Sequence, residues 1–237
     1  ASQPVDEQAV AVVARLRELK PGDIEDCRVR DLLVSELQRY RGFFARVMSQ
    51  TRRRVVNGES VPAAEKVLSI FEPHTALIAK DHTPPMFGHK LTITGGASGL
   101  VLDCVIERGN PADVTLVVRQ LERQKDLLGQ APHTAVFDGA YVSRDNFAQA
   151  KSLGTERPVF SKSRGLLSPE QMAGSRRTYR RLRHFRAGVE GVISFLKRSF
   201  GLDRCTWKGA RRFASYIWSG IVAANLTILA RARLCAG

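Results

Sequence analysis

A short strand that ends in an aspartate is predicted by the stretch TAVFDG at residues 134–139. Its first four residues are apolar or β-branched, as in strands that a sheet buries on both faces. The carboxyl end of such a strand is where ligands and metal ions meet an α/β sheet, and a glycine there lets a phosphate approach the backbone. An Asp-Gly pair is equally typical of a turn, so Asp138 is a candidate metal ligand with a purely structural alternative.

Further short elements surround this strand. Candidate strands cover 66–72, 89–94, 100–106 and 158–161, and candidate helices cover 111–128 and 143–152, the latter capped by Ser143. A glycine-rich turn joins the second and third of these strands into a hairpin. The resulting order of strands and helices predicts an α/β (α+β) fold with an RNase H-like mixed sheet flanked by helices.

Long helices are expected at both ends of the chain. Amphipathic patterns cover residues 7–19 and 29–56 in the N-terminal part. In the C-terminal part we expect a strongly basic helix over 176–200 and a final helix, rich in apolar residues, over 211–234. Asn57-Gly58 breaks the first pattern, and the composition then shifts to β-rich runs. We therefore expect an N-terminal helical segment over 1–60 and a second domain, with the sheet and the long C-terminal helices, over 61–237.

Positive charge is concentrated in one part of the chain. The formal net charge is +14, and the segment from Lys162 to Arg212 holds fourteen Lys and Arg residues against three acids. Such a block neutralises phosphates and releases counterions, so a polyanion is the expected partner. The alternative is a solvated basic face that serves solubility, but solubility does not require the charge to be concentrated.

Cysteines and apolar runs exclude several other classes. The four cysteines show no C-x2-C spacing, which argues against a zinc ribbon or a disulfide framework and fits a reducing compartment. No run of 18 or more apolar residues and no signal-peptide pattern is present, so we expect neither a membrane span nor secretion, and a cytoplasmic protein. The chain begins at Ala1 within a helical pattern, which suggests a longer polypeptide upstream.

One acid in the basic segment has a distinctive setting. Glu190 follows Arg186 by four residues and precedes Lys197 by seven, which places all three on one face of the expected helix. An ordinary Arg-Glu helix pair would explain part of this spacing. The same face also carries Ile193, which suggests that it points inward, and an acid on an inward face requires a partner or a metal ion.

These blocks resemble a known family. Residues 184–198 resemble the Tyr-x2-Arg-x3-Glu-x6-Lys signature of bacterial insertion-sequence DDE transposases, and residues 136–141 resemble the block that holds their second aspartate. Further similarity runs through 87–90, 109–113 and 204–209. The resemblance covers the chain from about Phe71 onward.

The resemblance implies a catalytic domain over 61–237 that cleaves DNA and transfers strands with Mg²⁺ or Mn²⁺, two ions in a complete site. Asp138 and Glu190 would be the catalytic metal ligands. The implied DNA contacts are Arg180, Arg181, Arg183, Arg186, Lys197 and Arg198. The implied partners are terminal inverted repeats and target DNA, with a possible homodimer on paired ends in the bacterial cytoplasm, associated with the nucleoid.

Two departures from the family pattern leave alternatives open. The signature's tyrosine is Arg183 here, although Tyr179 lies one turn earlier. The first aspartate of the family would lie before Ala1. Within the chain, Glu72 could replace it, Asp81 and Asp103 less readily, and Asp103 is more typical of a paired structural acid. The rival functions are a transposase remnant that only binds DNA and a structure-selective or RNA-directed nuclease.

Overall fold

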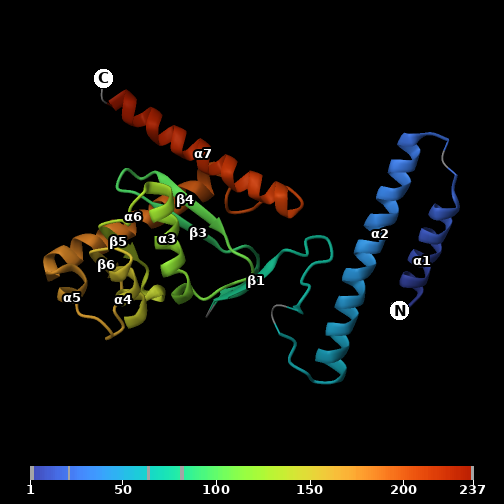
Figure 1. Cartoon of the computed structure of the whole chain (residues 1–237), viewed down its shortest axis with the longest axis horizontal. Helices are drawn as coiled ribbons and strands as arrows, with labels where there is room; N and C mark the ends of the chain where they lie inside the picture. Colours follow the sequence, from blue (N-terminus) through green and yellow to red (C-terminus); the bar gives the residue numbers. More distant parts are fainter. Residues whose placement is uncertain (1–2, 21, 63–64, 81–82, 236–237) are drawn as a thin grey trace. The chain divides into compact units, whose positions relative to one another are not determined.

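The computed structural model describes residues 3–20, 22–62, 65–80 and 83–235. Two compact units divide the chain, unit 1 (Ala1–Leu77) and unit 2 (Ile78–Gly237). Each unit is described by itself (Figure 1). The boundary at residue 60 that the sequence indicates stays a prediction.

Unit 1 is mainly a helical hairpin. The helices α1 (Gln3–Glu18) and α2 (Ile24–Thr51) lie side by side, and an ion pair of 2.7 Å between Arg41 Nε and Asp6 Oδ1 joins them (Figure 1). Both predicted helices are confirmed. The second begins five residues early, because the Asp23 side chain caps it by accepting a 2.8 Å hydrogen bond from the Asp26 amide. A π-helical turn (Arg52–Val56) continues it.

The prediction of a strand at 66–72 is wrong. The Gln50 side chain, on α2, forms hydrogen bonds with both backbone groups of Val67. It accepts one of 2.9 Å from the Val67 amide and donates one of 2.8 Å to the Val67 carbonyl. This segment is therefore tied to a helix instead of pairing in a sheet. Strands β1 (Ala76–Lys80) and β2 (Thr83–Gly88), which the sequence did not indicate, follow and pair with each other.

Unit 2 contains the predicted hairpin. Strands β3 (Leu91–Gly95) and β4 (Val101–Ile106) pair antiparallel, with an irregularity in register after Thr94. A 3-10 turn (Asp113–Thr115) leads into α3 (Val117–Leu128), which covers the hairpin. Arg123 of α3 pairs with buried Asp103 of β4 at 2.8 Å, and Arg119 pairs with buried Glu107. Two acid–arginine bridges thus hold the helix on the strand, and Asp103 is a paired structural acid.

A parallel pair of strands follows the hairpin. Strand β5 (Thr134–Phe137) pairs with β6 (Arg157–Phe160), and α4 (Arg144–Ser152), capped by Ser143, connects them. The predicted elements are confirmed. β5 is only half-buried, contrary to the expectation of a buried strand, whereas β6 is buried from its second residue onward. The stacked rings of Phe137 and Phe160, 5.5 Å apart, join the two strands within one apolar core.

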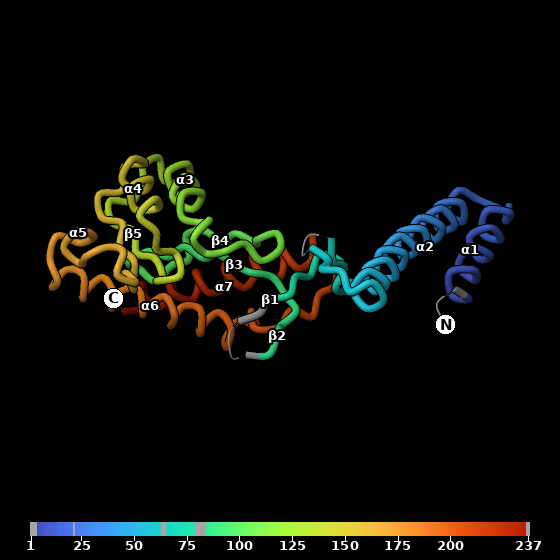
Figure 2. Tube along the Cα trace, turned by 90° about the horizontal axis from the view of Figure 1, so that it is seen from below, coloured from blue at the N-terminus to red at the C-terminus, as the bar shows by residue number. Residues whose placement is uncertain are grey.

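The α+β class is confirmed, with the strands arranged in pairs. Among the described residues, the antiparallel pair β3–β4 and the parallel pair β5–β6 are not hydrogen-bonded to each other. The mixed sheet that the sequence predicts is therefore present as two separate parts. In Figure 2, α3 and α4 lie on one side of these strands and α6 and α7 on the other.

Three helices complete unit 2. A short helix α5 (Pro169–Ala173), which the sequence did not indicate, follows β6, and α6 (Arg176–Phe200) and α7 (Ala210–Cys235) come after it. By length and composition α7 could cross a membrane, with a mean hydropathy of 1.5, but one such helix is weak evidence. Its buried side chains Ile217 and Ile221 pack into a core with Leu196 of α6 and Cys104 of β4.

The Asn225 side chain on α7 completes an edge of β4. Its amide accepts a 2.9 Å hydrogen bond from the Val101 amide and donates one of 2.8 Å to the Val101 carbonyl. The side chain thus replaces a neighbouring strand at this residue.

Replacing Asn225 with Ala should lower the free energy of unfolding by about 1–3 kcal/mol, because two backbone groups at a partly buried position lose their partners. Urea unfolding followed by circular dichroism measures the change. Ser219→Ala, an exposed position on the same helix, should leave stability within about 0.5 kcal/mol. Equal effects of the two substitutions would contradict this role for Asn225.

Candidate active site

A largely enclosed arginine, Arg186, lies at the centre of the site. The inward-facing side of α6 is otherwise apolar or aromatic, and its buried or half-buried members form an inward stripe that includes Tyr179, Leu182, Arg186, Val189, Ile193 and Leu196. The Arg186 side chain is 18% exposed, and its Nη1 atom is fully buried. A buried cation requires anionic partners, because its desolvation is otherwise uncompensated.

Asp138 is the first partner of this arginine. It directly follows β5, and its Oδ2 atom lies 3.3 Å from Arg186 Nη2. Its Oδ1 atom accepts hydrogen bonds from the Gly139 amide and from the Ser161 hydroxyl, the latter at 3.3 Å. Because Ser161 directly follows β6, the carboxylate lies where both parallel strands end. Half of the Asp138 side chain remains open to solvent.

Glu190 is the second partner. Its Oε1 atom lies 3.8 Å from Arg186 Nη1, and its side chain is 74% exposed. The prediction that Glu190 points inward is wrong. At about 100° per residue, Glu190 lies roughly 40° around the helix from Arg186, whereas Ile193 lies about 20° to the other side, so the arginine takes the inward position. One guanidinium therefore lies between two carboxylates that both reach solvent.

Lys197 lies outside this cluster. Its Nζ atom is 3.4 Å from Asp203 Oδ1, and eleven residues of helix place it about 16 Å along the axis from Arg186. A single phosphate cannot contact both side chains. The other predicted DNA contacts on α6, Arg180, Arg181, Arg183 and Arg198, are all exposed.

Tyr179 anchors α6 instead of replacing the tyrosine of the family signature. It is buried, and its hydroxyl donates to the carbonyl oxygens of Phe160 and Ser161, at 3.0 and 3.1 Å. It therefore has no group to offer a phosphate. The Arg183 guanidinium lies 5.9 Å from the centre of the Tyr179 ring. The anchor fixes α6 at the end of β6, two turns before Arg186.

Other residues at the site were not singled out by sequence. Burial, with smaller contributions from Asp113 and Asp138, raises the pKa of Tyr141 to about 12, so its hydroxyl stays protonated at neutral pH. Asp113 also pairs with Lys90, which links two of the blocks that resemble the family. Tyr141 lies within another such block, 136–141. Its place in this block is the only feature of the sequence that could have marked it as a site residue.

The structure requires a glycine at position 139 for a different reason from the one that the sequence suggested. A Cβ atom at this position would lie 2.6 Å from Lys162 Cβ and 3.3 Å from the Lys162 amide. The space beside Asp138 is therefore taken by the start of the 162–168 segment and is not open to a phosphate. This close approach holds Lys162 beside the ends of both strands.

The donor chemistry of the site suits a hard divalent cation only in part. Asp138 and Glu190 supply carboxylate oxygens of the kind that Mg²⁺ and Mn²⁺ prefer. Within the described part of the chain, no group of three or more His, Cys, Asp or Glu residues could hold a metal ion. Among the candidates for a further acid, Asp103 is paired with Arg123, Glu72 bonds to His74 at 2.6 Å within unit 1, and Asp81 lies outside the described residues.

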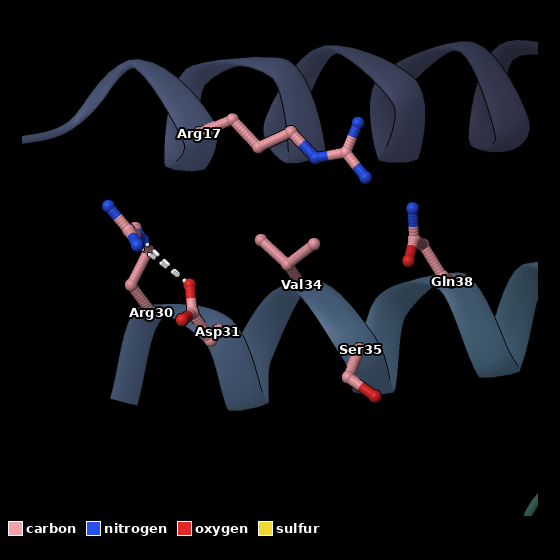
Figure 3. A pocket seen from close by; sticks show the side chains of 6 residues that line it. All are labelled: Arg17, Arg30, Asp31, Val34, Ser35 and Gln38. Carbon is pink, nitrogen blue, oxygen red and sulfur yellow. Dashed lines mark hydrogen bonds and ion pairs between the residues drawn. The ribbon is translucent and has the colours of Figure 1, made fainter. Parts of the chain in front are cut away.

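Unit 1 has a hollow of its own, with a volume of about 340 Å³, between α1 and α2 (Figure 3). It is lined by Arg17, Arg30, Asp31, Val34, Ser35 and Gln38. Its one acid, Asp31, already pairs with Arg30 at 2.8 Å. The hollow thus lacks the two carboxylates that distinguish the site in unit 2.

Comparison with known families identifies the class of protein. The α+β fold, the acid at the end of β5 and the basic helix with its own acid match what the sequence resemblance implies for a DNA-transposing protein. Residues 80–226 match the family model for the transposase DDE domain, and the chain belongs to this family. The predicted relation to insertion-sequence DDE transposases is confirmed. Neither the curated proteins nor the solved structures gave a significant match.

Replacing Gly139 with Ala should lower the free energy of unfolding by about 1–3 kcal/mol, because the new Cβ cannot be accommodated without moving Lys162. The matched control is Gly188→Ala in α6, where no atom lies within 4 Å of the new Cβ. This variant should gain up to about 1 kcal/mol from helix propensity. Thermal and urea unfolding would measure both changes, and a stabilised Gly139→Ala variant would contradict the close packing.

Proposed function

We propose that this chain is the catalytic portion of an insertion-sequence DDE transposase, which cleaves DNA phosphodiester bonds and transfers the resulting strands. Membership of the family supports a transposase function in general. The finer assignment rests on one observation: Arg186 joins Asp138 and Glu190, acids from a strand end and from a distant helix. This arrangement brings together the acids that the sequence resemblance marks as ligands.

Asp138 and Glu190 would hold the divalent cation, which the family generally requires, and about half or more of each side chain is open to solvent. Bound Mg²⁺ or Mn²⁺, as a pair of ions in a complete site, would activate water or a DNA 3′-hydroxyl and stabilise the leaving oxygen. Tyr141 stays neutral next to the site, so it adds no competing negative charge.

Arg186 would change partners during the reaction. Its Nη1 atom has no hydrogen-bond partner among the described residues, and its contacts with the two carboxylates are long, at 3.3 and 3.8 Å. The guanidinium fork of Arg186 could then turn to a phosphate of the DNA, to which it would donate two parallel hydrogen bonds. Lys197, about 16 Å further along the helix, would contact a different phosphate.

DNA is the proposed partner, both as terminal inverted repeats and as target, in the bacterial cytoplasm near the nucleoid. The exposed arginines of α6 support this assignment. A homodimer on paired ends belongs to the same proposal. The domain that carries the activity would be residues 61–237.

Strand cleavage and strand transfer on terminal-repeat DNA with Mg²⁺ or Mn²⁺ test the enzyme. Asp138→Asn and Glu190→Gln should each lower the rate on the order of 100-fold or more, because each removes a ligand charge, and chelation of the metal should abolish it. Glu122→Gln, at an exposed acid on α3, should leave the rate unchanged. Full activity in both site variants would overturn the assignment.

A transposase remnant that only binds DNA is the second candidate. It is compatible with the described residues, among which no group of three or more potential ligands could hold a metal ion. Salt-sensitive DNA binding without any metal-dependent cleavage would support it. Cleavage that depends on both acids would exclude it.

The outer face of α6 predicts a salt dependence. Arg180→Gln, Arg181→Gln and Arg183→Gln should weaken DNA binding on all sequences, and removing one arginine from a phosphate should reduce the slope of log K against log salt by about 1. Fluorescence anisotropy over a salt series measures the slope. Arg233→Gln, an exposed arginine near the end of α7, serves as the control. An identical slope in all four variants would contradict DNA tracking by α6.

A further inference from the structure

An exposed tryptophan stands in the loop between α6 and α7. Trp207 is 49% exposed and belongs to neither of the two apolar cores of unit 2. A large aromatic side chain open to solvent costs free energy that burial would recover. Its setting therefore calls for a ligand or a partner.

The loop holds this tryptophan in a defined place. The Tyr216 ring contacts it edge-on, with ring centres 5.6 Å apart and planes at 63°. The Tyr216 hydroxyl donates to the Gly201 carbonyl at 2.6 Å, which ties the start of the loop to α7. The Trp207 amide bonds to Cys205 Sγ at 3.4 Å. The indole is thus positioned before any ligand binds, so binding would cost little ordering entropy.

Positively charged residues flank the exposed tryptophan in the sequence. Four exposed cations lie within five residues of it in sequence: Arg204, Lys208, Arg211 and Arg212. The nearest acid in sequence, Asp203, faces Lys197 at 3.4 Å. The first turn of α7 contains no acid. An apolar protein partner would have to desolvate these cations, whereas a nucleic acid strand offers phosphates to them and a base to the ring.

The other tryptophan of the chain has a different environment. Trp218 is 43% exposed on α7, and the exposed apolar residues Val222, Leu226 and Leu229 continue along the helix. It belongs to an apolar stripe, whereas Trp207 belongs to a cationic loop. The two residues therefore form a matched pair for experiment.

We propose that Trp207 stacks on an unpaired base of a DNA strand while the neighbouring cations hold its phosphates. Bases in an intact duplex already stack on each other, whereas an unpaired base offers a free face to an aromatic ring. The loop would then recognise single-stranded or distorted DNA at a strand end, in contrast to the phosphate contacts of α6, which do not distinguish paired from unpaired DNA. This inference rests on the proposed DNA function.

The test measures binding of the full chain to a single-stranded oligonucleotide and to a blunt duplex by fluorescence anisotropy. Trp207→Ala should weaken binding to the single strand about tenfold, in line with the removal of one base–aromatic stack. Its affinity for the duplex should stay within about twofold. Trp207→Phe, which keeps a ring, should restore most of the difference, and Trp218→Ala should match the wild type on both DNAs.

Tryptophan fluorescence gives a second readout. Trp218→Phe leaves Trp207 as the sole tryptophan, and its emission should be quenched by the single strand; Trp207→Phe leaves Trp218, which should not respond. Equal weakening of both DNAs by Trp207→Ala, or no weakening of either, would overturn the stacking proposal while leaving DNA binding intact. A wild-type chain that binds neither DNA would overturn the proposed function together with it.

Discussion

The desolvation of one guanidinium constrains the geometry of the whole site. Arg186 lies in the inward stripe of α6, where a cation is tolerated only if anions meet it, and Asp138 and Glu190 do so from two elements. Two other contacts fix their separation. Tyr179 ties α6 to the end of β6, and the close approach of Lys162 to Gly139 sets the path of the chain beside Asp138. The elements that carry the two carboxylates are therefore held by packing, whereas about half or more of each carboxylate side chain stays open to solvent.

Ion pairs also join a helix to a strand elsewhere in unit 2. Arg123 of α3 pairs with Asp103 of β4, and Arg119 pairs with Glu107, which directly follows β4; both acids are almost fully buried. These arginines are neutralised within the fold, whereas no acid among the described residues pairs with the exposed α6 residues Arg180, Arg181, Arg183 and Arg198. The excess positive charge of the chain is thus divided into a structural part and a part available to a polyanion, and the second part lies next to the two acids and in the loop of Trp207.

Local signals explain which parts of the fold could be predicted. The helix α6 was predicted over its observed length because Ser175 caps its start and Gly201, in a left-handed conformation, ends it. Strand β5 and the Ser143 cap are equally local. The prediction of a strand at 66–72 failed because the Gln50 side chain binds the backbone of Val67, and no local sequence pattern reveals this contact. Likewise, the sequence spacing places Arg186 and Glu190 on one helical face, but only tertiary packing decides which of the two points inward. The continuity of the sheet also depends on pairing between strands that are distant in sequence.

The residue that best suits the proposed function at position 186 differs from the residue that would best stabilise the fold. Leucine or methionine would suit the inward stripe of α6 better than a buried cation, because burial of an apolar side chain needs no counter-charge. Under the proposed function, the arginine is kept for its charge and not for its packing. Relatives that still fold but no longer act on DNA could then carry leucine or methionine at position 186, with the apolar residues Leu182, Val189 and Leu196 of the stripe retained. The residue at this one position would therefore separate relatives that act on DNA from relatives that only fold.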